Sequence, residues 1–243
     1  MEINKNCKFF LRIAYSYDIA ACHYVILERL GFDLTGIPRD NKKERNIKIG
    51  LLMKENPRVT GILRNTTKSL IDECILKNNI KEDEVVLRQY DGLITTKQLT
   101  EVSNQYIPLE LRNVFDSFLI SIDRKKFLAF DSILSEISIK GVPYRYPRMD
   151  GIYEKLIKIN YGKKTSVFSD LQKIKDEVMS SNDPMLYAIP TSEGKYNIFL
   201  IRYGQIEISE SMARVMDPSD IDRQQYFNFY IRPFSESIVV EFV

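Results

Sequence analysis

The sequence predicts an α+β protein with antiparallel or mixed sheets backed by helices. Its 243 residues are 44% hydrophobic and 28% charged, with 10 glycines and 9 prolines, and this composition is typical of a folded protein rather than a disordered chain. Strand and helix patterns occur in both halves of the chain. In two places a short turn joins two strand patterns directly, which indicates β-hairpins and therefore antiparallel pairing.

The first predicted element is a strand that ends at an aspartate. Residues 8–17 are rich in aromatic and β-branched side chains, which favour strands, and Asp18 follows them. From residue 19 to residue 30 apolar side chains recur at helical spacing, and Gly31 then favours a helix end. The predicted order is strand, aspartate, helix.

A basic helix follows, and we expect Asp40 to cap its start. A further helix is predicted from about residue 64 to residue 77. The basic side chains of the first of these two helices are Lys42, Lys43, Arg45 and Lys48. Its apolar side is expected to carry Ile47, Leu51 and Leu52, with Pro57 beyond its end.

Two hairpins are predicted next. Strand-forming runs at 85–87 and 93–94 flank Tyr90-Asp91-Gly92, so Asp91 is expected at the tip of the first hairpin. The second hairpin is expected to pair 118–122 with 126–130 across Asp123-Arg124-Lys125. A short helix is predicted to follow it through residue 139.

The segment from Gly141 to Gly151 contains two prolines, and we expect it to join two parts of the chain. This divides the protein into residues 1–140 and residues 141–243. The second part is predicted to be a smaller α+β region. Its expected helices cover 152–160 and 168–180, and its expected strands cover 185–189, 196–208, 226–232 and 237–243.

Composition excludes several classes of function. With three cysteines, no Cys-x-x-Cys pair and one histidine, a structural zinc site, a disulfide framework and a histidine-dependent hydrolase are all disfavoured. No apolar run approaches the ~20 residues of a membrane helix, and the first residues lack a secretory pattern, so we expect a cytoplasmic protein. The net charge of +2 means that any nucleic-acid site must be a local basic patch.

Asp18 and Asp91, each at the end of a predicted strand, are the candidate metal ligands. Mg²⁺ and Mn²⁺ prefer carboxylate and phosphate oxygens, so two aspartates beside a triphosphate suffice to hold them. The basic helix between the two aspartates could then bind the phosphates. The alternative is that both aspartates are ordinary turn residues.

Two segments carry a family resemblance. Asp18-Ile-Ala-Ala-Cys-His-Tyr-Val-Ile-Leu27 resembles the first palm motif of family B DNA polymerases, an Asp followed by Ser-Leu-Tyr-Pro-Ser and two aliphatic residues. His23 stands at the tyrosine position and Tyr24 at the proline position. Lys42-Lys-Glu-Arg-Asn-Ile-Lys-Ile-Gly50 resembles the fingers motif Lys-x-x-x-Asn-Ser-x-Tyr-Gly of the same family, with Ile in place of Ser and Tyr.

Two further segments follow in the family's order. Leu87-Arg-Gln-Tyr-Asp-Gly-Leu-Ile94 resembles the third motif, Tyr-x-Asp-Thr-Asp-Ser, with Asp91 at the second aspartate and Gln89 replacing the first. Lys125-Lys-Phe127 is similar to the Lys-x-Tyr strand of the protein-primed branch, which contacts the primer end, with Phe127 replacing the tyrosine.

The resemblance implies a minimal or split polymerase: a palm in residues 1–140 with short fingers helices at about 38–78, and a thumb-like or accessory part in 141–243. It implies template-dependent nucleotidyl transfer by a two-metal mechanism on primer-template DNA and deoxynucleoside triphosphates. Because 17 residues precede Asp18, a partner chain is expected to supply exonuclease or amino-terminal regions. The expected site residues are Asp18 and Asp91 for catalysis and Mg²⁺ or Mn²⁺; Lys42, Arg45, Asn46 and Lys48 for the nucleotide; and Lys125 and Phe127 for the primer.

Arg145 and Arg148 are further candidate DNA contacts, because they alternate with tyrosines and bases stack on aromatic rings while basic groups follow the phosphate backbone. An exposed linker is the alternative for this segment. For the whole protein, two other functions stay open. One is a catalytically inactive palm scaffold that binds nucleic acid or a replication partner, and the other is a metal-dependent nuclease. The abundance of Lys, Asn and Ile is compatible with an A·T-rich viral genome, and then with the host cytoplasm.

Overall fold

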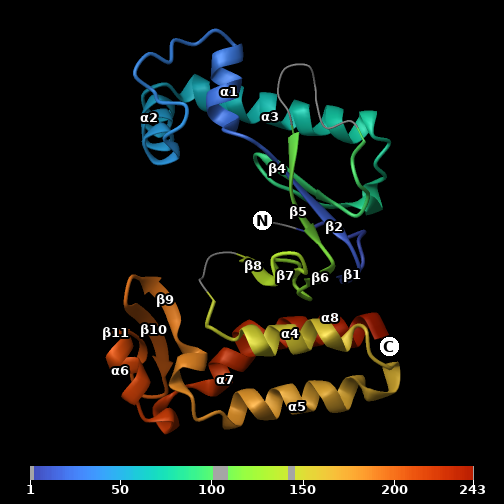
Figure 1. Cartoon of the computed structure of the whole chain (residues 1–243), viewed down its shortest axis with the longest axis vertical. Coiled ribbons are helices and arrows are strands. Elements are labelled where there is room, and N and C mark those ends of the chain that lie inside the picture. Colours follow the sequence, from blue (N-terminus) through green and yellow to red (C-terminus); the bar gives the residue numbers. More distant parts are fainter. Residues whose placement is uncertain (1–2, 101–108, 142–145, 243) are drawn as a thin grey trace. The chain divides into compact units, whose positions relative to one another are not determined.

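The computed structural model describes residues 3–100, 109–141 and 146–242 (Figure 1). The chain forms two compact units. Residues 13–114 form the middle unit, and residues 1–12 with 115–243 form the terminal unit. The middle unit has one sheet and the terminal unit has two, and each unit has its own hydrophobic core.

The sheet of the middle unit places the two predicted aspartates side by side. Its strands are β2 (Ala14–Ile19), β3 (Val85–Arg88), β4 (Gly92–Thr95) and β5 (Leu109–Phe115), in the order β3-β4-β2-β5. A 3₁₀ turn, Glu82–Glu84, precedes β3. β4 pairs antiparallel with both β2 and β3, with Asp18 opposite Gly92. The predicted hairpin with Asp91 in its turn is therefore confirmed.

The helices of the middle unit are α1 (Cys22–Arg29), α2 (Lys42–Glu55) and α3 (Pro57–Lys77). The Asn41 side chain caps α2 by accepting a hydrogen bond from the amide of Glu44 at 3.1 Å. Asn56 caps α3 in the same way, and Pro57 takes the first helical position, where its missing N–H leaves no bond unmade.

Three details of this helical pair differ from prediction. Asn41, not Asp40, caps α2, and α3 begins at Pro57 rather than near residue 64. On α2 the buried residue is Ile49, whereas Ile47 and Leu51 are 55% and 52% exposed. Since residues two apart on a helix point in nearly opposite directions, burying Ile49 exposes Ile47 and Leu51, whereas Leu52, the third residue of the predicted apolar side, is half-buried and packs against the core.

The terminal unit begins with a sheet in which the amino-terminal strand pairs with a later hairpin. Its strands are β1 (Phe10–Leu11), β6 (Ser117–Ile120), β7 (Lys126–Asp131) and β8 (Glu136–Gly141), in the order β1-β6-β7-β8 with antiparallel pairs. The second predicted hairpin is confirmed as β6–β7. The short helix predicted through residue 139 is wrong, because Ile137 and Ile139 alternate along β8, which pairs with β7.

The rest of the terminal unit contains helices and a small antiparallel sheet of order β11-β10-β9. The predicted strands at 226–232 and 237–243 are wrong. Tyr226, Tyr230, Phe234 and Ile238 are buried at a spacing of four, which is helical. The elements are α4 (Asp150–Ile159), α5 (Val167–Ser180), β9 (Ile189–Ser192), β10 (Lys195–Leu200), β11 (Gly204–Ser209), α6 (Glu210–Val215), α7 (Arg223–Tyr226), a π-helical turn (Phe227–Ile231) and α8 (Arg232–Phe242), with 3₁₀ turns at Lys164–Ser166, Pro184–Tyr187 and Pro218–Asp220.

The predicted class is confirmed: the protein is α+β, with antiparallel sheets backed by helices. The division differs from the predicted boundary at residues 140 and 141. Leu119 and Leu128 of the β6–β7 hairpin lie in one core with residues of α4, α5 and α8, so the hairpin belongs with the carboxyl-terminal helices. Among the described residues, no helix has the length and apolar character needed to cross a membrane.

Candidate functional site

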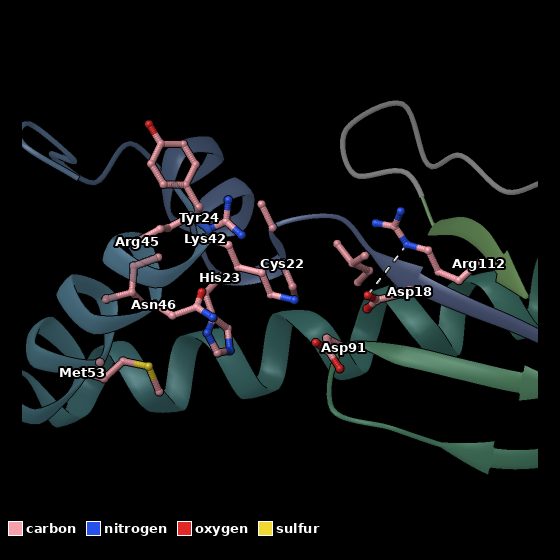
Figure 2. A pocket seen from close by; sticks show the side chains of 14 residues that line it. Asp18, Cys22, His23, Tyr24, Lys42, Arg45, Asn46, Met53, Asp91 and Arg112 are labelled. Atoms are coloured by element: carbon pink, nitrogen blue, oxygen red, sulfur yellow. Dashed lines mark ion pairs between the residues drawn. The ribbon is translucent and has the colours of Figure 1, made fainter. Parts of the chain in front are cut away.

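The middle unit contains a pocket of about 420 Å³ (Figure 2). Its walls come from the end of β2, the start of α1, one face of α2, the β3–β4 turn and β5. The lining residues are Asp18, Ile19, Ala21, Cys22, His23, Tyr24, Lys42, Arg45, Asn46, Ile49, Gly50, Met53, Asp91 and Arg112. Five predicted site residues, namely Asp18, Asp91, Lys42, Arg45 and Asn46, therefore line a single pocket.

Strand pairing sets the positions of the two aspartates. The amide of Ile19 donates a hydrogen bond to the carbonyl oxygen of Asp91 at 2.8 Å, directly beside the Asp18–Gly92 pair. A Cβ atom at Gly92 would lie 2.5 Å from the carbonyl oxygen of Tyr17, which is closer than real Cβ atoms approach. Only glycine at this position lets β4 come so near to β2, and this approach brings Asp91 beside Asp18.

The turn between β2 and α1 forms another part of the pocket wall. Ala21 has φ 50° and ψ 38°, a left-handed conformation that is uncommon for alanine. This sharp turn starts α1 immediately after the strand, so that Cys22 and His23 face the pocket. A strained backbone held in place by its surroundings is often found at functional sites.

The electrostatics of Asp18 follow from its surroundings. Burial raises the pKa of the Asp18 carboxyl, and the nearby negative charge of Asp91 raises it further, while Arg112 and Lys42 oppose both effects. The Nε atom of Arg112 lies 3.9 Å from Oδ2 of Asp18 (Figure 2). Two carboxylates that repel each other across a polar pocket would gain from a shared cation.

The donor set fits a hard divalent cation. No cluster of three or more His, Cys, Asp or Glu side chains suited to a metal occurs within residues 3–100, 109–141 and 146–242. A closed zinc site, which needs four protein ligands, therefore does not fit the described residues. Two carboxylates fit Mg²⁺, which keeps several waters and takes its other ligands from substrate phosphates.

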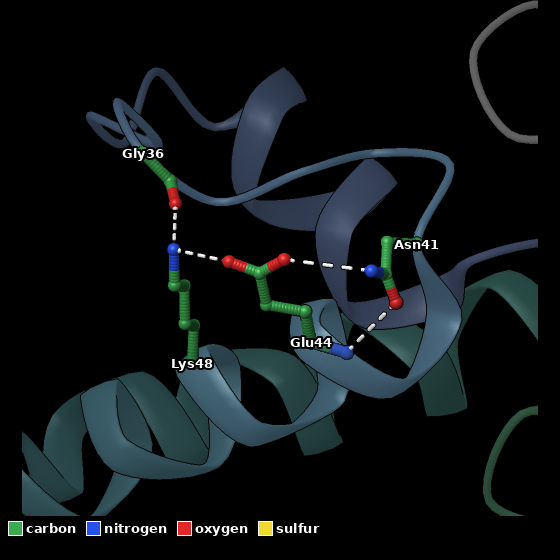
Figure 3. Close-up of polar contacts among 4 residues, drawn as sticks. All are labelled: Gly36, Asn41, Glu44 and Lys48. Atoms are coloured by element: carbon green, nitrogen blue, oxygen red, sulfur yellow. Dashed lines mark hydrogen bonds and ion pairs between the residues drawn. The ribbon is translucent and has the colours of Figure 1, made fainter.

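Helix α2 supplies the positive side of the pocket. Lys42, Arg45 and Asn46 follow a three- and four-residue spacing, so they share one helical face. Lys48 is not among the lining residues. Its ammonium group donates to the carbonyl oxygen of Gly36 and pairs with Glu44 at 2.7 Å, so that it fastens the preceding loop to α2 (Figure 3).

Sequence reasoning missed Arg112 and placed His23 only at the tyrosine position of the first motif. Nε2 of His23 is buried and has no hydrogen-bond partner among the described residues. Its ring contacts Tyr90 edge-on at 5.2 Å, and burial lowers its pKa. Arg112 lies on β5, which carried no motif; the polar pair Glu110 and Arg112, two residues apart on one strand face, was the available signal.

The remaining predicted site residues belong to the terminal unit. Lys125 is an exposed turn residue, but Phe127 is 2% exposed and stacks on Phe118 with ring centroids 4.3 Å apart. Its ring is part of the core, so the surface contact predicted for it with the primer is not available. Arg148 is exposed and its guanidinium lies 5.4 Å from the centre of the Tyr196 ring. Arg145 lies outside the described residues.

Neither a protein-family model nor a curated protein sequence matches this chain. Among solved structures, the chain is similar to the family B DNA polymerase from the hyperthermophilic archaeon Pyrobaculum calidifontis, with a TM-score of 0.48 and 9% sequence identity. The match covers 95% of this chain and 45% of the polymerase chain, so this chain spans less than half of that protein's length. The function is therefore inferred from the pocket's own residues.

Proposed function

We propose that the middle-unit pocket binds a nucleoside triphosphate together with Mg²⁺ or Mn²⁺, and that the protein is a DNA polymerase-like nucleotidyltransferase acting on primer-template DNA. One observation carries this proposal. Two aspartates at adjacent strand ends and the polar face of one basic helix line the same pocket. An acidic side for cations opposite a basic side for phosphates is the arrangement that a metal–triphosphate complex requires.

Asp18 and Asp91 would hold the divalent ions. When bound, two such ions stabilise the attacking 3′ oxygen and the leaving pyrophosphate of an in-line displacement. Lys42 and Arg45 would neutralise the phosphates, and the Asn46 amide would donate a hydrogen bond to them. Gln89, in the β3–β4 turn beside Asp91, adds no charge, so among the described lining residues the carboxylates available to the ions are those of Asp18 and Asp91.

Exposed basic residues of the terminal unit are the proposed DNA contacts. Lys125 and Arg148 have side chains open to solvent, and Arg145 is proposed with them from its place in the sequence. A partner chain that supplies exonuclease or amino-terminal regions, and a cytoplasmic location, remain part of the same proposal.

A primer-extension assay tests this function. The full chain is incubated with a labelled primed template, the four deoxynucleoside triphosphates and Mg²⁺ or Mn²⁺. We expect extension by the unmodified protein and its loss in Asp18→Asn and Asp91→Asn. Lys42→Ala should raise KM for the nucleotide, whereas Lys43→Ala, which removes an exposed lysine next to it that does not line the pocket, should have no effect.

Extension that survives both aspartate variants would overturn the assignment of the site. No extension with either metal, together with equal binding of the primed template by the unmodified and variant proteins, would favour the inactive scaffold. Cleavage of the primed template without added nucleotide would favour a nuclease.

A further inference from the structure

We propose that Arg112 is a resident counter-ion of the Asp18–Asp91 pair, which competes with the divalent cation in the nucleotide-free protein and moves to the triphosphate when nucleotide binds. This role concerns the same pocket, and it therefore rests on the proposed function. Arg112 lies outside all four sequence motifs, and in this role it would control when the cation binds.

The position of Arg112 supports the first half of this role. It lies on β5, the neighbour of β2 in the sheet, and its side chain lines the pocket beside Asp18 (Figure 2). Its Nε atom is 3.9 Å from Asp18, while Nη1 is 3.0 Å from Glu110. Glu110 forms an ion pair with the same guanidinium. A guanidinium stays charged at every physiological pH, so the counter-ion is always present.

The charge balance shows why the two cations would compete. No described residue forms an ion pair or a side-chain hydrogen bond with the Asp91 carboxylate, and Arg112 is the cation within 4.0 Å of Asp18. Lys42 also acts on Asp18, with a smaller effect than Arg112. A unit charge about 4 Å from a carboxylate in water-like surroundings changes the binding of a cation there by about fivefold, and by more where water is partly excluded.

The second half of the role follows from what Arg112 can bind. Its side chain is 44% exposed and 3.9 Å is longer than a direct hydrogen bond, so the guanidinium is not locked onto Asp18. Phosphate oxygens accept paired hydrogen bonds from a guanidinium and match its fork geometry. A triphosphate in the pocket would therefore draw Arg112 away from Asp18 and free the aspartates for the cation.

Two titrations of the full-length chain test the role. In the first, Mn²⁺ is added without nucleotide and the free ion is followed by electron paramagnetic resonance. In the second, dATP is added in EDTA and binding is followed by calorimetry. Arg112→Ala should bind Mn²⁺ about fivefold more tightly and dATP about fivefold more weakly. A residue with only a structural role would weaken both.

Arg39→Ala is the matched control. Arg39 also lies 3.9 Å from a carboxylate, that of Glu28, in the same unit, and it does not line the pocket, so its removal should change neither titration. Unchanged or weaker Mn²⁺ binding by Arg112→Ala overturns the counter-ion role. If Asp91→Asn still lowers Mn²⁺ affinity by about tenfold in that event, the proposed function stands without it. Absence of Mn²⁺ binding in both the unmodified protein and Arg112→Ala overturns both.

Discussion

Both the β3–β4 and the β6–β7 hairpins carry an aspartate in the turn, and the two aspartates make different contacts. In the β6–β7 turn, Asp123 accepts hydrogen bonds from the Ser121 hydroxyl at 2.6 Å and from the Lys125 amide at 3.0 Å. In the β3–β4 turn, no described residue hydrogen-bonds to the Asp91 carboxylate or pairs with it, and the side chain faces the pocket. An aspartate at a hairpin turn is thus either a local cap or an available ligand.

The basic residue Arg124 of the β6–β7 turn is also bound by other groups of the protein. Arg124 donates to the carbonyl oxygens of Asn4 at 2.6 Å and Cys7 at 2.9 Å, and its guanidinium lies 4.4 Å from the centre of the Phe9 ring. These bonds fasten the amino-terminal segment to the hairpin. Since a group that is already satisfied gains little from a ligand, the difference between the hairpins lies in which polar atoms the protein itself has used.

Phe127→Ala tests whether the β6–β7 hairpin serves the stability of the fold, and it should have the largest effect of these variants. Removing a buried ring that stacks on Phe118 should lower the free energy of unfolding by about 3–5 kcal/mol. Urea denaturation followed by circular dichroism measures the change. Phe168→Ala, at a site that is 63% exposed in the same unit, should cost less than about 0.5 kcal/mol. Similar costs for both variants would show that Phe127 is not core.

Gly92→Ala should damage both the fold and the site. Because the new Cβ would meet the carbonyl oxygen of Tyr17 at 2.5 Å, β4 must move from β2, at a cost of about 1–3 kcal/mol. The shift separates Asp91 from Asp18, so Mn²⁺ binding should weaken as well. Gly61→Ala on α3, where a Cβ meets nothing within 4 Å, should instead stabilise the unit by about 0.5–1 kcal/mol. A harmless Gly92→Ala would contradict the close approach.

Matched aspartate variants compare the two turns directly. Asp91→Asn should lower Mn²⁺ affinity by about tenfold, since half of the acidic pair is lost, with little change in unfolding. Asp123→Asn should leave Mn²⁺ affinity unchanged and lower the free energy of unfolding by about 1 kcal/mol through its weakened hydrogen bonds. Mn²⁺ titration and urea denaturation of both variants measure these effects. The reverse pattern would exchange the roles assigned to the two hairpins.

The smallest expected effect is a pH dependence from Asp18. Burial and Asp91 raise its pKa in the folded protein above the ordinary 3.8, so the folded state binds more protons than the unfolded state between these two values. Stability should therefore fall as the pH rises through that interval. With a side chain 43% exposed, water screens the effect to less than about 1 kcal/mol. Melting temperatures of the unmodified protein and Asp18→Asn from pH 3 to pH 7 should diverge as the pH rises; parallel curves would count against it.

Sequence reasoning from local signals succeeded where the signal acts over a few residues. The helices that follow Asp18 and both hairpins are set by helix caps and turn chemistry. The single strand predicted over residues 8–17 instead divides into β1 and β2, which lie in different sheets. The order of the motifs also predicted that Asp18, Asp91 and the start of α2 belong to one site. Local signals failed at 226–243, where aromatic and branched residues favour strands but their burial at a spacing of four is helical.

Local sequence signals could therefore place Asp18 and Asp91 near strand ends and the basic residues on α2, but could not decide which side chains stay available to a ligand. Lys48 is bound to Gly36 and Glu44, and Phe127 is buried against Phe118. Arg112 lies near Asp18 although β5, which carries it, is distant from Asp18 in the sequence. Each of these outcomes depends on a contact made only when the sheet or the helices pack. Burial and hydrogen-bond satisfaction are properties of that packing, and only the tertiary structure decides them.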